Sequence, residues 1–344
     1  MNNEINTNLL EETAKKLLEQ GKGILAADES NGTADKKLAS VDIEGGEENR
    51  RKYRELFLCM NGLEEFVSGV ILYDETFWQK DCGGQKTFVE KLQENKIVPG
   101  IKVDLGAKDF PGFPDEKLTI GLDDLAERAQ KYFDGGARFT KWRAVFSIDE
   151  SKGLPTEETI EANADVLGRY ARIVQEIGLV PIIEPEVLLV GEHSIEQSKV
   201  ITKKVVAKVF EKMSEYRVYI PGVILKTSMV INGNANADEA SPEEVADATV
   251  EMLLESVPKD VGGVVFLSGG QTAVEATAHL DAIVDKDALP YEIAFSYARA
   301  LQQPALRAWK GKGENVEIAR EEFKKRLKLN QIADAGDYKI DMEF

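Results

Sequence analysis

The feature that most constrains the fold is a repeated order of elements. A short apolar run is followed by a segment of helical periodicity about eight times along the 344 residues. Such runs, rich in β-branched residues, predict buried strands. Strands that alternate with helices form parallel sheets, and eight such units close a barrel. The sequence therefore predicts an α/β protein, a single (β/α)8 (TIM) barrel domain over residues 1–344, with a C-terminal tail at 335–344.

The predicted strands begin near Gly23, Gly69, Val98, Arg138, Val180, Gly222, Gly263 and Ile293. A doubly wound open sheet is the competing architecture. It is disfavoured because no Gly-x-Gly-x-x-Gly pattern follows the first predicted strand.

Helices are expected before the first strand and after the last one. A capping-box pattern at Asn8 predicts the first helix, and helical periodicity predicts two more at 300–309 and 315–329. Residues 31–47 are small and polar, and 105–117 are rich in Gly and Pro, so both are expected to be loops. The polar tail is expected to have little structure of its own.

Charge and composition exclude several classes of partner. A formal net charge of −18 argues against a nucleic-acid or anionic-membrane partner, although a local basic pocket remains compatible with it. The two cysteines, Cys59 and Cys82, are expected to stay reduced, and the two histidines, His193 and His279, make a histidine-rich metal site hard to build. No apolar run reaches membrane-spanning length and no leader pattern precedes the first helix, so a cytoplasmic protein is expected.

Lys226 lies in the middle of an apolar run at 222–232. A buried ammonium is costly unless it is paired or gives up its proton. A lysine held neutral is a nucleophilic amine that attacks a carbonyl to form a Schiff base. The alternatives are a lysine paired with a carboxylate and a lysine at the strand end that points into water.

The ends of the other predicted strands also carry polar groups, and barrel active sites lie at these carboxyl ends. The residues are Asp28, Lys102, Asp104, Lys141, Arg143, Glu184, Glu186, Lys226, Ser268 and Arg299. Residues at i and i+2 share a strand face, so Glu184 and Glu186 are expected to point the same way, as are the pairs at 141/143 and 102/104. Neighbouring lysines lower the pKa of a nucleophilic amine and so favour its neutral form. Carboxylates carry protons during the steps of Schiff-base chemistry. The alternative is an inert network of ion pairs.

Two anion sites are expected at the barrel mouth. Loops after the seventh and eighth strands commonly bind phosphate, and glycine amides and an arginine suit that role. The residues there are Ser268, Gly269, Gly270 and Arg299. A second site on the opposite side has the candidates Ser30, Thr33, Lys37 and Lys102, with Arg50 more remote.

With these residues identified, the chain closely resembles the class I fructose-1,6-bisphosphate aldolases from about Leu17 to Leu329. The resemblance is carried by the segments Gly-Ile-Leu-Ala-Ala-Asp28-Glu-Ser30, Gly-Ile-Lys102-Val-Asp, Lys141-Trp-Arg143, Val-Pro-Ile-Ile-Glu184-Pro-Glu186, Ile-Leu-Lys226 and Phe-Leu-Ser268-Gly-Gly-Gln. Together these motifs are highly specific.

The resemblance implies a role for each matching residue. Lys226 forms the Schiff base with the ketose C2 carbonyl, Glu184 is the acid/base for the carbinolamine, and Asp28 takes the C4 hydroxyl proton. Lys141 and Glu186 place charge around the reacting centre, and Arg143 holds substrate. The C1-phosphate residues are Ser268, Gly269, Gly270, Ser296 and Arg299, and the C6-phosphate residues are Ser30, Thr33, Lys37 and Lys102. The resemblance implies a phosphorylated sugar substrate, no metal or cofactor, and a homo-oligomer, since the family is often tetrameric.

The chain departs from the family pattern at several positions. It ends in Phe344 where vertebrate members end in tyrosine, has Thr227-Ser228 where many have Pro-Asn, and has Ala298 where many have Gly. Lys37 replaces a common arginine, which weakens bidentate phosphate contact. The alternatives are an aldolase acting on sedoheptulose 1,7-bisphosphate, a pyridoxal phosphate enzyme, a zinc aldolase and a non-catalytic barrel scaffold.

Overall fold

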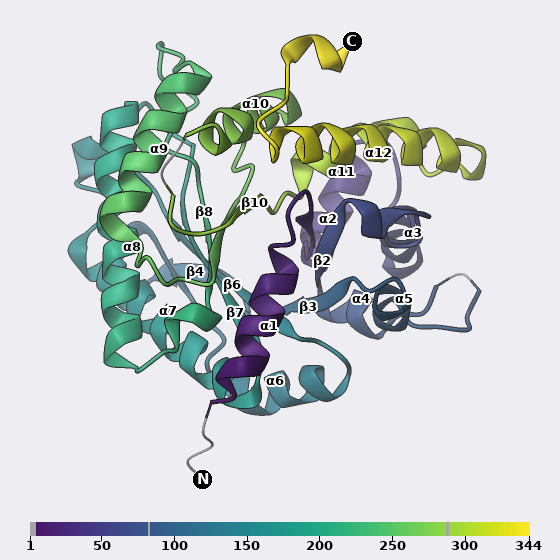
Figure 1. Cartoon of the computed structure of the whole chain (residues 1–344), viewed down its shortest axis with the longest axis horizontal. Coiled ribbons are helices and arrows are strands. Elements are labelled where there is room, and N and C mark those ends of the chain that lie inside the picture. Colours follow the sequence, from purple (N-terminus) through teal and green to yellow (C-terminus); the bar gives the residue numbers. More distant parts are fainter. Residues whose placement is uncertain (1–4, 82, 287–288) are drawn as a thin grey trace.

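The computed structural model describes residues 5–81, 83–286 and 289–344. Within these ranges, eight parallel strands form one sheet in the order β1-β2-β3-β6-β7-β8-β9-β10 (Figure 1). Their bounds are β1 (Gly23–Ala27), β2 (Val67–Leu72), β3 (Val98–Lys102), β6 (Phe139–Phe146), β7 (Val180–Val187), β8 (Ile224–Thr227), β9 (Gly263–Phe266) and β10 (Ile293–Phe295). The sheet closes where the N–H of Ala26 donates to the carbonyl of Tyr297 at 3.0 Å. The predicted eight-stranded α/β barrel is confirmed.

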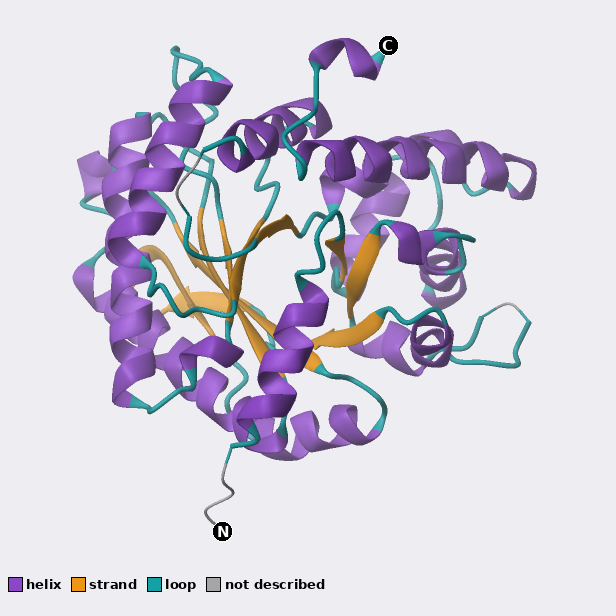
Figure 2. Ribbon diagram, viewed as in Figure 1, coloured by secondary structure: helices purple, strands orange, loops and turns teal. Residues whose placement is uncertain are grey.

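Helices surround the strands (Figure 2). The α-helices are α1 (Thr7–Leu17), α2 (Asn31–Ala39), α3 (Glu47–Leu58), α4 (Asp74–Trp78), α5 (Phe88–Glu94), α6 (Leu125–Asp134), α7 (Glu157–Ile177), α8 (Ile195–Glu215), α9 (Pro242–Ser256), α10 (Ala273–Val284), α11 (Arg299–Trp309) and α12 (Val316–Ala333). Short 3-10 turns lie at Leu63–Glu65, Glu150–Lys152, Ile220–Gly222, Gly313–Asn315 and Ile340–Glu343. None of the described helices is long and apolar enough to cross a membrane.

Helix α1 closes the amino-terminal end of the barrel. Its residues Leu10 and Leu17 pack into the same buried cluster as the inward-facing Phe139 and Val180 of the strands. The approach is close at the start of β9, where a Cβ on Gly263 would lie 1.9 Å from Leu18 Cδ1. Side chains therefore fill the barrel interior at this end, and barrel active sites lie at the opposite end, where the strands finish.

The expected loop at 31–47 is wrong over its first part, which forms α2. The Ser30 side chain caps this helix by accepting from the N–H of Thr33, and Ala34 and Leu38 are its buried residues. Because this apolar face contains only two residues, the periodicity in the sequence was too weak to indicate a helix.

The excursion at 105–117 is likewise not all loop. Part of it forms an antiparallel hairpin of β4 (Ala107–Phe110) and β5 (Phe113–Thr119), with the rings of Phe110 and Phe113 stacked at 4.5 Å. The hairpin is outside the barrel sheet, where the prolines of this stretch are tolerated as edge residues.

Both chain ends also differ from expectation. The first helix is capped by Asn6, whose side chain accepts from the N–H of Leu9, so it begins earlier than the pattern at Asn8 predicts. The tail lies beside α10 and α12 (Figure 1), and two of its residues anchor it although most of the others are exposed. Tyr338 is buried there, and both oxygens of Glu343 accept from Arg326 at 2.6 Å. Of the two cysteines, Cys82 lies outside the described residues.

Candidate active site

A cavity of about 470 Å³ opens at the carboxyl ends of the strands. With one exception, the residues that the sequence suggested for catalysis or substrate binding line it, namely Asp28, Ser30, Thr33, Lys37, Lys102, Lys141, Arg143, Glu184, Glu186, Lys226, Ser268, Gly269, Gly270, Ser296 and Arg299. The more remote candidate, Arg50, instead pairs with Asp35 and Glu75 and does not line the cavity. The barrel thus gathers residues from seven of its strand ends around one space.

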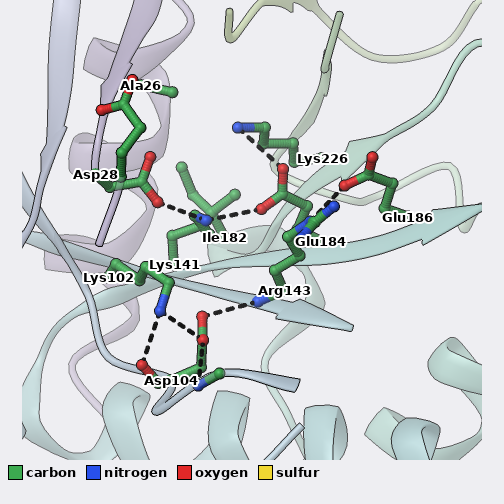
Figure 3. Close-up of polar contacts among 12 residues, drawn as sticks. Ala26, Asp28, Lys102, Asp104, Lys141, Arg143, Ile182, Glu184, Glu186 and Lys226 are labelled. Carbon is green, nitrogen blue, oxygen red and sulfur yellow. Dashed lines mark hydrogen bonds and ion pairs between the residues drawn. The ribbon is translucent and has the colours of Figure 1, made fainter. Parts of the chain in front are cut away.

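Four side chains of alternating charge form a continuous chain of ion pairs across the cavity floor (Figure 3). The Nζ of Lys226 lies 3.1 Å from Oε1 of Glu184. The other oxygen of Glu184 lies 2.9 Å from the Nζ of Lys141, which in turn lies 2.6 Å from Oδ2 of Asp28. Lys226 is only 3% exposed, so it faces the cavity and not bulk water.

Strand register explains this convergence. Arg143 of β6 is in register with Glu184 of β7, and Lys141 lies two residues before Arg143 on the same strand face. In β8, Ile224 belongs to the cluster inside the barrel, so Lys226 two residues later also points inward. The i and i+2 spacing predicted that these residues share a strand face, and the cavity that they line together agrees with it.

The lysines hold both central carboxyls in their ionised form. Burial alone would raise the pKa of Asp28, but the ammonium groups of Lys141 and Lys226 outweigh it and hold that pKa well below its usual range. The pKa of Glu184 is lowered against the same burial by the same two lysines and by Arg143. Conversely, Asp28 and Glu184 raise the pKa of Lys141 although burial opposes its charge.

Lys226 was expected to be an uncharged amine, with a carboxylate-paired lysine as the alternative. The structure pairs it with Glu184, and this partner itself lines the cavity. The ion pair therefore leaves the amine of Lys226 inside the cavity. It also places Glu184, a proton acceptor, directly beside that amine. The free amine stays a prediction, made for the step in which the amine attacks the sugar.

One side of the cavity is suited to an anion. After β9, Gly269 and Gly270 adopt positive φ angles of 46° and 107°, a backbone geometry that favours glycine. The hydroxyl of Ser296 is buried without a hydrogen-bond partner among the described residues. Arg299 is exposed at the first position of α11, where the helix dipole also favours negative charge.

On the opposite side, each lysine is already paired with a buried carboxylate. Lys37 forms an ion pair with Glu29. The other carboxylate oxygen of Glu29, Oε2, lies 2.7 Å from Nη1 of Arg54. Lys102 lies 2.6 Å from Asp104. Glu29 also lines the cavity but was not among the predicted site residues. Its position next to Asp28 at a strand end is the sequence signal that could have identified it.

Closer to the centre of the cavity, Arg143 forms an ion pair with Glu186. Burial would lower the pKa of Arg143, but Glu186 outweighs it and keeps the guanidinium charged. At the end of β8, Ser228 donates to the carbonyl of Val187 at 2.9 Å, so this departure from the family pattern ties two strand ends together.

A buried lysine paired with a carboxylate inside a barrel mouth, between cationic and glycine-rich walls, is the arrangement that Schiff-base chemistry in a barrel enzyme requires. The chain belongs to the class I fructose-bisphosphate aldolase family, because that family's model matches residues 9–343.

Relatives cover nearly the whole chain. A fructose-bisphosphate aldolase of Dictyostelium discoideum is 48% identical over 95% of this chain and 91% of its own. The cytosolic fructose-bisphosphate aldolase 4 of Arabidopsis thaliana is 46% identical over 94% of this chain and 82% of its own. The fructose-bisphosphate aldolase of Plasmodium falciparum, solved in complex with TRAP and a small-molecule inhibitor, is 45% identical and superimposes with a TM-score of 0.95 over 96% of this chain and 95% of that one.

Proposed function

We propose that the protein is a class I fructose-bisphosphate aldolase, a carbon–carbon lyase that reversibly cleaves fructose 1,6-bisphosphate to dihydroxyacetone phosphate and glyceraldehyde 3-phosphate. Membership of the family supports the reaction class. The observation that carries the proposal is the 3.1 Å contact between the Lys226 amine and the Glu184 carboxylate inside the cavity. An amine beside a proton acceptor, in a space lined by cations, suits a phosphorylated ketose.

The first half of the reaction forms the imine. Glu184 takes a proton from the Lys226 ammonium, and the free amine attacks the C2 carbonyl of the sugar. A second proton moves from the attacking nitrogen to the carbonyl oxygen and gives a neutral carbinolamine. Glu184 then returns its proton to that hydroxyl, which leaves as water. The product is a protonated imine, whose positive nitrogen draws electrons from the adjacent carbon.

The second half breaks the carbon–carbon bond. Asp28, held ionised by Lys141, takes the proton of the C4 hydroxyl. The C4 oxygen becomes the aldehyde, and the electrons of the C3–C4 bond move into the imine to give an enamine. Protonation of the enamine at C3 and hydrolysis of the imine release dihydroxyacetone phosphate and restore Lys226.

The remaining residues hold the substrate between two anion sites. Lys141 keeps Asp28 and Glu184 ionised, and the Glu186–Arg143 pair places charge beside the reacting carbons. The C1-phosphate is assigned to Ser268, Gly269, Gly270, Ser296 and Arg299. The C6-phosphate is assigned to Ser30, Thr33, Lys37 and Lys102.

Purified protein is to be assayed with fructose 1,6-bisphosphate and with sedoheptulose 1,7-bisphosphate in parallel, with both triose products quantified. We expect cleavage of the six-carbon substrate to be the faster reaction. A higher kcat/KM for the seven-carbon sugar would reassign the substrate, and no cleavage of either would favour the scaffold alternative.

A cytoplasmic location and self-association are part of the same proposal. Relatives include both cytosolic and chloroplastic enzymes, so the location is to be tested directly by cell fractionation. Light scattering on the purified protein measures the number of chains in solution.

A further inference from the structure

Asp104, two residues beyond the end of β3, has a carboxylate that accepts three hydrogen bonds at the cavity rim (Figure 3). It is 5% exposed. Its Oδ1 accepts from the Nζ of Lys102 at 2.6 Å and from the N–H of Gly106 at 3.0 Å. Its Oδ2 accepts from the N–H of Arg143 at 3.2 Å.

These contacts fix the carboxylate to two segments of backbone. The Arg143 amide belongs to β6, and the Gly106 amide directly precedes the β4–β5 hairpin. A buried carboxylate with two backbone donors is a rigid part of the scaffold. Lys102, which lines the cavity, is therefore held by a fixed anchor rather than by another mobile side chain.

The geometry leaves the lysine able to bind an anion. An ammonium group has three N–H donors. Asp104 accepts two of them, one on its carbonyl at 2.9 Å and one on Oδ1 at 2.6 Å. The third donor remains for a phosphate oxygen in the cavity, so phosphate is able to bind without displacing Asp104.

We propose that Asp104 is a positioning residue that pre-orders Lys102 for the 6-phosphate of the substrate. This inference rests on the proposed function and extends it to a residue that does not itself touch the reacting atoms. A lysine already held in one conformation loses less side-chain freedom when phosphate binds. Asp104 therefore selects for the phosphate at C6 and has no effect on the phosphate at C1.

A purely structural role makes a different prediction. If Asp104 only supported the hairpin, its loss would affect all substrates alike. If its negative charge opposed the incoming phosphate, its loss would lower KM for the bisphosphate. If Asp104 acts only by pre-ordering Lys102, its loss raises KM selectively for the substrate that carries a 6-phosphate.

The test compares Asp104→Asn and Asp104→Ala with wild type on two substrates, fructose 1,6-bisphosphate and fructose 1-phosphate. We expect KM for the bisphosphate to rise about tenfold, the effect of losing one charge-assisted contact, with kcat little changed. KM for fructose 1-phosphate should change by less than about twofold. Asp104→Asn keeps the size of the side chain and decides the question if Asp104→Ala does not fold.

Asp109→Asn is the matched control, because Asp109 is an exposed hairpin carboxylate paired with Lys117 and lies outside the cavity lining. It should leave both KM values unchanged.

Adding Lys102→Met to Asp104→Asn should cause no rise in KM beyond that of Lys102→Met alone. Equal effects on the two sugars, a lower KM for the bisphosphate, or additive effects in the double variant would overturn the inference. A wild-type protein that cleaves neither sugar would instead reject the proposed function.

Discussion

The Nζ of Lys226 and Oε1 of Glu184 lie 3.1 Å apart, within reach of direct proton transfer. The same carboxylate contacts Lys141 through its other oxygen at 2.9 Å. Glu184 is therefore placed between the amine that attacks the sugar and a cation that stays charged throughout. This relationship suits Glu184 to its proposed role as the proton carrier of the imine-forming steps.

Replacing Glu184 with Gln removes this proton carrier but keeps its shape. We expect kcat to fall by about 10²- to 10⁴-fold, the usual contribution of a general acid/base, with a much smaller change in KM. Steady-state cleavage of fructose 1,6-bisphosphate measures both. Glu322→Gln, an exposed position on α12, is the control and should behave like wild type. Near-normal kcat for Glu184→Gln would assign the proton transfers to another group.

Asp28→Asn separates the two halves of the reaction. The variant should lose cleavage of fructose 1,6-bisphosphate, because no base remains for the C4 hydroxyl. It should still form an imine with dihydroxyacetone phosphate, which has no C3–C4 bond to break, and borohydride reduction detects that adduct by mass. Loss of both activities together would place Asp28 in imine formation rather than in bond cleavage.

Acid stability should depend on the same carboxylate. The pKa of Asp28 is lower in the folded protein than in the unfolded chain because Lys141 and Lys226 outweigh burial. Its contribution to stability is therefore complete above the unfolded pKa of about 3.9 and is lost as pH falls toward the folded value. Urea unfolding at pH 7 and at about pH 3, below the unfolded pKa, should show a smaller acid-induced loss in Asp28→Asn than in wild type. An equal loss in both would contradict this assignment.

Asp334, at the C-terminal end of α12, should change the pH dependence of folding stability in the opposite direction from Asp28. Burial raises its pKa to about 7, although the N–H of Gly21 donates to it. The folded protein then binds this proton more tightly than the unfolded chain does, so stability falls as pH rises from about 4 to 7. Asp334→Asn keeps an acceptor for Gly21 and should be more stable than wild type at pH 8, by on the order of 2–4 kcal/mol.

Urea unfolding of both proteins at pH 5 and pH 8 tests the role of Asp334. The stabilisation by Asp334→Asn should shrink at the lower pH. A destabilised variant at pH 8 would show that the ionised carboxylate has a partner there.

The sequence predicted the barrel and the residues that line its mouth from two patterns. One is the alternation of apolar runs with helical segments, and the other is the i and i+2 spacing of polar residues at the strand ends. Apolar runs located the strands, and the i and i+2 rule placed Glu184 and Glu186 on one face. All parallel strands end at the same rim, so charges far apart in the chain were expected to meet. Pairing was harder to predict, because which carboxylate neutralises Lys226 depends on strand register and side-chain conformation.

Local elements with weak patterns were missed. Helix α2 buries only Ala34 and Leu38, which is too little periodicity to distinguish it from a loop. The tail was expected to be loose because its sequence is polar. It is held by the contact of Glu343 with Arg326, a pairing that depends on how the tail lies against α12 in the folded chain.

The central claim is that Lys226 forms a covalent imine with the sugar. Incubation with dihydroxyacetone phosphate and sodium borohydride, followed by peptide mass mapping, tests it most directly. Lys226→Arg, which keeps the charge but supplies no lysine amine, is the control. We predict one reduced adduct per chain on Lys226 and none in the variant. An adduct on another lysine such as Lys141, or no adduct under conditions in which the sugar is cleaved, would contradict the account.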